Sequence, residues 1–424
     1  MSRRSVVASS ALIPKIVRMN LLRRHPIAVA LIALVLLSAL DPLPPLLDAA
    51  SGTPAFDADL VRPATYTVLA PLSDALDALT FLSLERARWF LVFWVGVLAL
   101  WGLLRRGSLA QRLGRAVVGP VSLVLLGLAA AVLPRPVPQL LAADSTVTVI
   151  DYHAHTSASH DGRRGWTAED LAAWHEAQGF AASYVTDHNV VFNRHLDGTP
   201  IPLLPGVEWS VYQQHVIALG DTLPIDRAPY ERDTPGMLRL LPALHRAGAI
   251  GIASLPEYWR HHWDDLDAFV TAGVDGFEIT NCAPQALGFP PPARRRVLAL
   301  AAEHDLLVVG ASDNHGWGKV TCVWNLSSPS AHGYRANRVI ARSVALAQGD
   351  WQGWTAPYTQ PWLMLQSLSW SERSSWITWI VVILIYRSVP RRQGDPPGIG
   401  ILARSLSLKI LKLRRPTTPA GAPE

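Results

Sequence analysis

The sequence predicts an α/β domain flanked by transmembrane helices, and two observations support this expectation. Apolar strand-like runs alternate with helical stretches between residues 147 and 312. Such alternation is typical of parallel strands joined by crossover helices, either in a barrel or in an open sheet. In addition, 50% of the 424 residues are hydrophobic and only 17% are charged, and the apolar excess gathers in a few runs outside that region.

Four apolar runs have the composition of membrane-spanning helices. We expect spans at about residues 27–46, 87–105, 116–134 and 372–388, of which the last is the weakest. Tryptophans lie near the ends of these runs, where interfacial aromatic residues concentrate: Trp89, Trp101, Trp376 and Trp379. The weaker alternative is that the runs are buried helices of a large soluble protein.

Basic residues set the expected orientation, because positively charged loops stay in the cytoplasm. Unopposed arginines and lysines precede the first run, occupy the 105–115 loop and crowd the tail, whereas the 41–88 segment is mainly acidic. This pattern predicts a multi-pass protein of the inner membrane, with cytoplasmic termini and with residues 134–372 outside the cytoplasm. The same clusters account for most of the basic excess, with its pI near 9.4, so no nucleic-acid partner is expected.

Residues that carry chemistry stand at the ends of the expected strands. The strand 147–155 ends with His153 and His155, and side chains two residues apart point to the same face of a strand. Similar residues fall at or just beyond the ends of later expected strands: His188, Glu208, Asn281 and Asp313. Asp161 comes six residues after His155, and His315 comes two residues after Asp313. Because chemistry in β/α barrels gathers at the carboxyl ends of the strands, we expect a single site.

A set of histidines and carboxylates without a thiolate suits Zn²⁺, Mn²⁺ or Fe²⁺. Each motif alone has an ordinary explanation, such as a hydrogen-bonded strand histidine, a turn aspartate or a surface glutamate. Their joint occurrence in order favours a metal centre. Two ions about 4 Å apart can stabilise both the attacking and the leaving oxygen of a phosphoryl transfer.

The motifs together resemble the polymerase and histidinol phosphatase (PHP) family over residues 147–320. They are His153-x-His155, Ser159-x-Asp161-Gly, Thr186-Asp-His188, Pro205-Gly-Val-Glu208 and Ser312-Asp313-x-His315. The resemblance implies a distorted seven-stranded β/α barrel that binds two or three divalent ions and hydrolyses phosphoesters. It also implies the ligand sets: His153, His155, Glu208 and Asp313 for one ion, and Asp161, His188 and His315 for another. Glu208 would bridge to a third position, served by His215.

The chain departs from the family pattern near that third position. Where the family commonly has His-Pro, the chain has Leu255-Pro256, and Leu255 cannot bind a metal. Asn281 stands where some members carry histidine, so it stays a candidate ligand. Glu257, His261 and His262 could move in, but we expect them to be ordinary surface residues. Histidines without a partner motif are expected to be structural or exposed: His160, His175, His245 and His304.

These patterns divide the chain into three expected parts. Residues 1–145 would form a membrane region with three spans, residues 146–345 the hydrolase domain, and residues 346–424 the last span and a basic cytoplasmic tail. The expected function is hydrolysis of a phosphomonoester or phosphodiester, small or lipid-linked, by a metal-bridging hydroxide. Arg260 is the first candidate for a phosphate contact, with Arg164 and Lys319 as alternatives.

Two other functions stay open at this point. Leu255 motivates a degenerate metal-binding sensor, and the same type of centre could hydrolyse a C–N or C–O bond, since a fold does not fix its chemistry. The two cysteines, Cys282 and Cys322, could pair outside the cytoplasm. Two cysteines form no disulfide framework, so the unpaired state is the preferred expectation.

Overall fold

The computed structural model describes residues 25–388, except for 221–224, 262, 319, 331–332 and 351. Residues 30–377 form one compact unit, and the few described residues outside it belong to a second. The predicted boundaries at residues 145 and 345 stay a prediction. Lys319, His262 and most of the basic termini lie outside the described residues.

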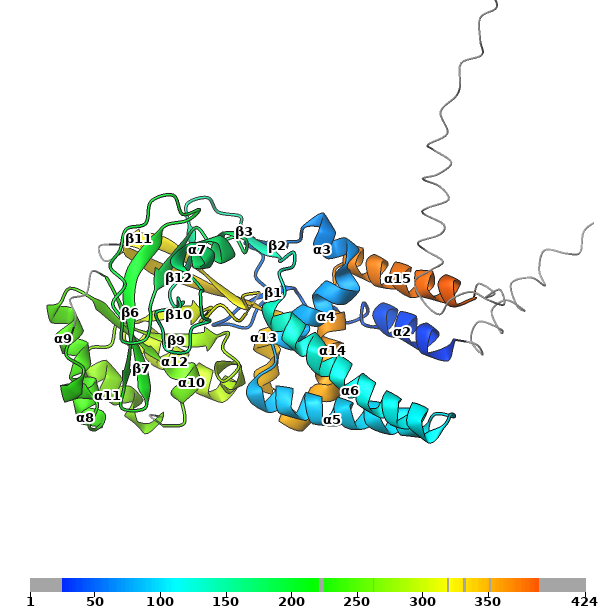
Figure 1. Cartoon of the computed structure of the whole chain (residues 1–424). Coiled ribbons are helices and arrows are strands. Elements are labelled where there is room, and N and C mark those ends of the chain that lie inside the picture. The colour runs from blue at the N-terminus through cyan, green and yellow to red at the C-terminus, as the bar shows by residue number, and fades with distance from the viewer. Residues whose placement is uncertain are drawn as a thin grey trace, which may run out of the picture. The chain divides into compact units, whose positions relative to one another are not determined.

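A curled ten-stranded sheet forms the centre of the large unit (Figure 1). Seven strands follow one another across it in chain order: β4 (Thr148–Asp151), β5 (Ala182–Val185), β6 (Leu203–Val211), β7 (Gln214–Leu219), β8 (Ile250–Ser254), β9 (Gly276–Asn281) and β10 (Leu307–Ala311). Beyond β4 the sheet continues, with antiparallel pairing, through β11 (Val323–Ser330), β12 (Gly333–Arg342) and β1 (Leu46–Asp48). A separate antiparallel pair joins β2 (Ala58–Val61) to β3 (Gln139–Ala142).

The seven strands expected from the alternation are present, but their pairing is mixed instead of wholly parallel. β7 runs antiparallel to both β6 and β8, because no crossover helix separates β6 from β7. The chain reverses there at Tyr212 and Gln213, which have positive φ values of 39° and 59°. The strands outside β4–β10 were not expected. A closed seven-stranded barrel stays a prediction, since the edge strands of the observed sheet are β1 and β10.

Two features draw the ends of the seven-stranded part together. An isolated parallel bridge joins Ala154 to Asn314, just beyond β4 and β10. The second feature is the buried side-chain amide of Asn325. It donates to the backbone carbonyls of Ile150 and Gly310, and its oxygen accepts from Gly310 N at 2.8 Å. Gly310 is required here, because a Cβ would lie 2.3 Å from Val323 Cγ2. The carboxyl ends of β4 and β10 therefore meet at one place.

Short helices connect and flank these strands. They are α7 (Ala168–Glu176), α8 (Thr234–Leu238), α9 (Leu240–Arg246), α10 (Leu255–Tyr258), α11 (Leu266–Thr271) and α12 (Pro291–Glu303). α8 and α9 are separate helices that meet at Arg239, because Pro242 lacks the N–H that a continuous helix would bond to residue 238. The remaining helices of the described chain are α2 (Pro26–Leu37), α3 (Ala64–Val68), α4 (Ala70–Thr80), α5 (Leu84–Leu104), α6 (Leu109–Val132), α13 (Ser343–Leu346), α14 (Ala356–Gln366) and α15 (Trp370–Ser388).

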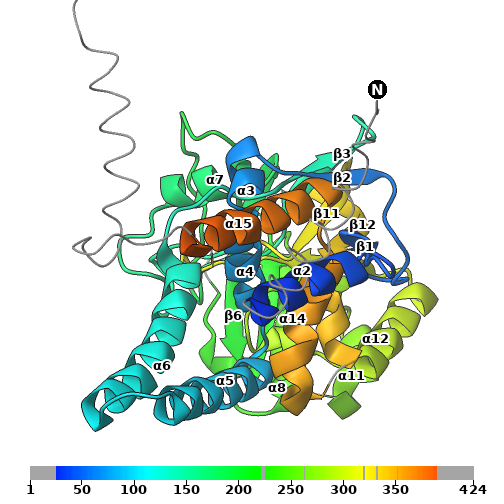
Figure 2. The same ribbon diagram turned by 90° about the vertical axis from the view of Figure 1, so that its right-hand side faces the viewer.

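Two of these helices, α5 and α6, are long and apolar enough to cross a membrane, and both are largely exposed. They lie side by side as a hairpin (Figures 1 and 2). Near the tip the contact is close, since a Cβ on Gly102 would lie 2.5 Å from Ala116 N. Within the described residues, α2 is too short at 12 residues, and α15 is not apolar enough, to count as a helix that could cross a membrane. Length and composition alone are weak evidence of a membrane span, and the first span, the last span and the orientation stay predictions.

Candidate metal centre

Four of the predicted ligands converge beside β6, just beyond the ends of β4 and β10. The Nε2 atoms of His153 and His155 lie 2.9 Å apart, and both face the same carboxylates. Glu208 Oε2 lies 3.0 Å from His153 Nε2 and 3.2 Å from His155 Nε2. Asp313 Oδ1 lies 3.1 Å from His155 Nε2. The structure therefore brings together the group that the resemblance implies for one ion.

A second group of predicted ligands adjoins the first and is more exposed to solvent, since the Asp161 side chain is 45% exposed. Asp161 Oδ1 lies 3.2 Å from His315 Nε2, and Asp161 Oδ2 lies 3.5 Å from His188 Nε2. The ligand atoms of His155, His188 and His315 also lie within 4.8 Å of one another. The imidazoles of His155 and His315 stack with their centroids 3.9 Å apart, so the two groups share one wall.

Glu208 extends the cluster toward a third group. Its Oε1 lies 2.7 Å from His215 Nδ1, while its Oε2 also lies 3.1 Å from His188 Nδ1. Glu257 Oε2 approaches His215 Nδ1 to 3.7 Å, and the Glu257 side chain is only 14% exposed. The expectation that Glu257 is an ordinary surface residue is wrong. α10 starts directly after β8 and turns this side chain toward the cluster.

The geometry of these groups fits a divalent cation. Metal–ligand bonds of about 2.1 Å place neighbouring ligand atoms roughly 2.9 to 3.4 Å apart, depending on whether the coordination is octahedral or tetrahedral. The distances within the first group span this range. Moreover, both carboxylate oxygens of Glu208, Asp313 Oδ1 and His315 Nε2 are buried, and none of their close contacts with neighbouring side chains has hydrogen-bond geometry. Buried polar atoms without partners are costly, and a cation at their meeting point would satisfy them.

The charges in the cluster support one another. Burial opposes ionisation of Glu208, but the imidazoles of His153 and His215 hold its pKa well below the usual range. Burial likewise opposes protonation of His153, yet Glu208, Asp313 and Glu278 raise its pKa well above the usual value. The site thus has a strong demand for positive charge, which either protons or metal ions can meet.

Surrounding hydrogen bonds fix the orientation of the two leading histidines. His153 Nδ1 lies 2.9 Å from Glu278 Oε1, and His155 Nδ1 lies 2.8 Å from Ser159 Oγ. Asp187 accepts from the Ser159 hydroxyl at 3.2 Å and from Thr156 N at 2.7 Å, so it holds the loop after His155. Each imidazole therefore directs Nε2 toward the shared centre, as metal-binding histidines commonly do.

Glu278 is the support that we expect to matter most. It is fully buried in β9, and its Oε2 accepts from Ser254 Oγ and Asn281 Nδ2. In Glu278→Gln, one carboxylate oxygen becomes an NH₂ group. At the Oε1 position this group would face the N–H of His153, and at the Oε2 position it would face the donors of Ser254 and Asn281. We expect metal affinity to fall by about 10- to 100-fold, measured by calorimetric titration of Mn²⁺ or Zn²⁺. The exposed Glu303→Gln is the control, and equal affinities in both variants would contradict the assigned role.

Asn281 lies beside the cluster with both ends of its amide engaged. Its Nδ2 donates to Asp313 Oδ2 at 3.0 Å, and its Oδ1 accepts from Ala283 N at 2.7 Å. Asp313 itself has a φ of 47°, a left-handed conformation that costs a non-glycine residue about 1 to 3 kcal/mol. The amide of Asn281 therefore stabilises the position of a strained carboxylate. This arrangement does not support the predicted role of Asn281 as a direct metal ligand.

The predicted phosphate contact is not brought to the cluster. The exposed Arg260 has its guanidinium 4.7 Å from the centroid of the Trp259 ring. Arg164 is also exposed. Among the described residues that line the cavity at the cluster, none is lysine or arginine. The role of Arg260 stays a prediction without a supporting contact.

Two further residues at the site had been set aside or missed. His160, expected to be structural or exposed, is 76% exposed but lies near the second group, and its ligand atom can join Asp161 and His188. Its place in Ser159-His160-Asp161 was the available signal. Glu278 carried no signal, because nothing in its neighbouring sequence marks the partner of His153. By contrast, His175 is structural as expected, with Nε2 2.8 Å from Asp151 Oδ2.

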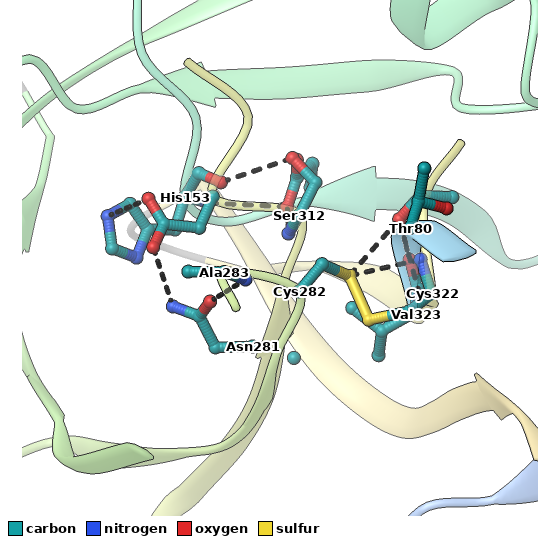
Figure 3. The surroundings of a disulfide bond; sticks show 12 residues. Thr80, His153, Asn281, Cys282, Ala283, Ser312, Cys322 and Val323 are labelled. Atoms are coloured by element: carbon teal, nitrogen blue, oxygen red, sulfur yellow. Dashed lines mark hydrogen bonds and ion pairs between the residues drawn. A yellow bond between two sulfur atoms is a disulfide. The ribbon is translucent and has the colours of Figure 1, made fainter. Parts of the chain in front are cut away.

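A disulfide closes one wall of the site. Cys282, the residue after β9, is bonded to Cys322, the residue before β11. The preferred expectation of unpaired cysteines is wrong, because the two segments lie side by side only in the folded sheet. Figure 3 shows the disulfide with Thr80 on one side and with Asn281 and His153 on the other. The bond therefore ties the segment after Asn281 to the adjacent part of the sheet.

Comparison with known proteins gives limited information. No protein-family model matches the chain, and no curated protein sequence does. Among solved structures, PsfC from Pseudomonas syringae matches at 18% identity over 48% of this chain and 97% of its own, with a TM-score of 0.36. A protein from Bifidobacterium adolescentis described as a metal-dependent phosphoesterase matches at 19% identity over 44% of this chain and 92% of its own, with a TM-score of 0.30. The lesion-specific endonuclease EndoQ from Pyrococcus furiosus matches at 9% identity over 43% of this chain and 53% of its own, with a TM-score of 0.29. TM-scores of this size do not establish a shared fold, so the function has to be inferred from the chain's own residues.

Proposed function

We propose that the chain is a metal-dependent phosphoesterase. The observation that carries this proposal is the convergence of buried, unpartnered donor atoms from Glu208, Asp313 and His315 with the paired imidazoles of His153 and His155. Such an arrangement has no use as a hydrophobic core, because each unpaired polar atom costs free energy when buried. It is suited to holding divalent cations, and the motif order resembles that of PHP phosphoesterases.

The residues divide into three adjoining binding positions. His153, His155, Glu208 and Asp313 would hold the first ion, and Asp161, His188 and His315 would hold the second, with His160 at its edge. Divalent ions there would lower the pKa of a coordinated water and neutralise charge on the phosphate oxygens. Asn281 and Glu278 keep Asp313 and His153 in place.

Glu257 offers a replacement ligand at the third position. Leu255 replaces a family ligand and is buried at 2% exposure, so it cannot contribute. Glu257, two residues later, supplies a carboxylate next to His215, which contacts Glu208 Oε1. Burial is the main cause that raises the pKa of Glu257, and the negative charge of Asp313 is the second. Together they raise this pKa to about 8 in the absence of metal. We infer that Glu257, His215 and Glu208 together hold a third ion.

Turnover by the full-length protein tests the function. Purified in detergent with Mn²⁺ or Zn²⁺, it should hydrolyse an aryl phosphomonoester or an aryl phosphodiester, and comparing the two identifies the class of ester. Chelation should stop the reaction and added metal should restore it. Stoichiometric metal binding without turnover of either ester would instead favour the sensor alternative.

We further propose that the site lies outside the cytoplasm and that α5 and α6 cross the inner membrane. The exposed apolar surfaces of both helices and a disulfide beside the site support this placement, because disulfides persist in oxidising compartments. The arginines at the hairpin tip, between residues 105 and 115, favour a cytoplasmic tip. An alkaline phosphatase reporter fused after residue 345 should be active, and one fused at residue 110 inactive. The reverse pattern would contradict the orientation.

A further inference from the structure

The candidate metal centre opens into a cavity of about 800 Å³ that continues to the α5–α6 hairpin. Its polar end is lined by the proposed ligands, with Asp161, Glu208 and Asp313 among them. Its other end is lined by apolar residues from the end of α4, from α5 and from α6. These apolar residues include Phe81, Leu82, Leu84, Ala87, Phe90, Leu91, Ala130 and Ala131. The apolar end is thus built mainly from the two helices that could cross a membrane.

The apolar end is held firmly against the site. Leu84 N, at the start of α5, donates to Pro284 O at 2.9 Å, in the loop that follows Cys282. Arg135, just after α6, donates from Nη1 to Ala130 O at 2.7 Å and from Nη2 to the buried Asp77 at 3.1 Å. Hydrogen bonds therefore fix the base of the hairpin at both α5 and α6. The apolar end of the cavity is held next to its polar end by these bonds.

Side chains at and beside the apolar end of the cavity are partly exposed. Leu91 lines the cavity and is 40% exposed, and the neighbouring Val92 is 61% exposed. A molecule could therefore enter from the side that would face hydrocarbon in a membrane. This access would suit a substrate already dissolved in the bilayer.

The lining selects between substrate types. A nucleotide or sugar phosphate carries polar groups next to its phosphate, and these would need hydrogen-bond partners. Beyond the metal centre, however, α5 and α6 offer mainly aliphatic and aromatic side chains. A hydrocarbon chain can lie against such a surface without leaving any polar group unpaired. A polar centre that leads into an apolar channel therefore fits an amphiphile with a phosphate head.

We propose that the substrate is a phosphate monoester of a long-chain lipid alcohol, with its hydrocarbon chain along α5 and α6. This inference rests on the proposed phosphoesterase function and narrows it. Water would add to phosphorus, the bond from phosphorus to the lipid oxygen would break, and the lipid alcohol would leave with a proton, so that inorganic phosphate remains. Diacylglycerol phosphate and polyprenyl phosphate share this chemistry, and both are to be tested.

Two glycines offer a matched pair of variants. Gly127 in α6 lines the cavity and Gly96 in α5 does not, and a Cβ at either position would meet nothing within 4 Å. Gly127→Leu therefore places an isobutyl group in the proposed chain site, whereas Gly96→Leu places one elsewhere on the hairpin. Both changes raise helix propensity to the same extent, so a general effect on the hairpin appears in both.

The full-length protein is assayed in mixed detergent micelles with an aryl phosphate and with each of the two lipid phosphates. We expect at least one lipid phosphate to be hydrolysed with a higher kcat/KM than the aryl phosphate. In Gly127→Leu, the ratio of the lipid to the aryl kcat/KM should fall about tenfold or more, because the added isobutyl group occupies space that the lipid chain needs. In Gly96→Leu the ratio should match that of the wild type.

The outcomes separate the two proposals. Hydrolysis of the aryl phosphate alone, or an equal ratio in both variants, would overturn the lipid inference and leave the phosphoesterase intact. If no ester is hydrolysed, binding of a non-hydrolysable lipid phosphonate is measured in the same micelles. Binding weakened by Gly127→Leu but not by Gly96→Leu would support the lipid site and count against the esterase. Absence of binding would overturn the lipid site as well.

Discussion

Glu208→Gln should lower kcat/KM for the phosphoester by roughly 10³-fold or more, which corresponds to the loss of several kcal/mol of charge stabilisation. Glu208 is the most connected group of the centre, because its two oxygens face His153, His155, His188 and His215. Glutamine preserves its size but removes its charge, and it replaces one acceptor with an NH₂ group that cannot bind a metal. The variant should therefore bind metal poorly and lose turnover.

The control for this change is Glu176→Gln, at the exposed end of α7. It removes the same charge from the same type of side chain at a distance from the cavity, and its kcat/KM should stay within about twofold of the wild type. Circular dichroism of both variants checks that the chain has folded. A folded Glu208→Gln protein with more than a tenth of the wild-type activity would contradict the assigned role.

The Cys282–Cys322 bond should contribute about 4 kcal/mol to the free energy of unfolding. The estimate follows from the 40-residue separation of the two cysteines, because closing a loop of that length restricts the unfolded chain. Replacing both cysteines with alanine removes this restriction. Urea unfolding in detergent measures the loss of stability. A reductant should lower the stability of the wild type but not that of the double alanine variant.

Activity provides a second measurement on the same variant. The bond anchors the segment directly after Asn281, which in turn donates to Asp313. We therefore expect the double variant to unfold more easily and also to require more metal for half-maximal activity. Wild-type protein that unfolds at the same urea concentration with and without reductant would show that the bond does not act in this way.

Much of the centre was predictable because its ligands lie in short motifs at strand ends. His153 and His155, or Asp313 and His315, are separated by a single residue, so the sequence itself shows that they act together. Their meeting with Glu208 follows from the general rule that strand ends share one face of a sheet. The structure brings these predicted ligands together, although their binding of metal has still to be measured.

Other features depended on contacts between distant segments and carried no local signal. Glu278 lies within the apolar strand β9, and only the three-dimensional fold brings its carboxylate to His153. The sequence around Glu257 does not show that α10 begins directly after β8 and turns this side chain toward the cluster. The disulfide likewise required the segments around residues 282 and 322 to lie side by side. Both β6 and β7 were expected as strands, but their antiparallel pairing was not, because the turn Tyr212-Gln213 contains neither glycine nor asparagine.

Metal content is the most direct test of the central claim. Full-length protein saturated with Mn²⁺ or Zn²⁺ and freed of excess metal is analysed by mass spectrometry, and the ions are located by anomalous diffraction. We expect at least two ions per chain, one of them bound by His153, His155, Glu208 and Asp313, and we expect Asp313→Asn to retain fewer. Fewer than two ions in the wild type, or ions located away from these residues, would contradict the account.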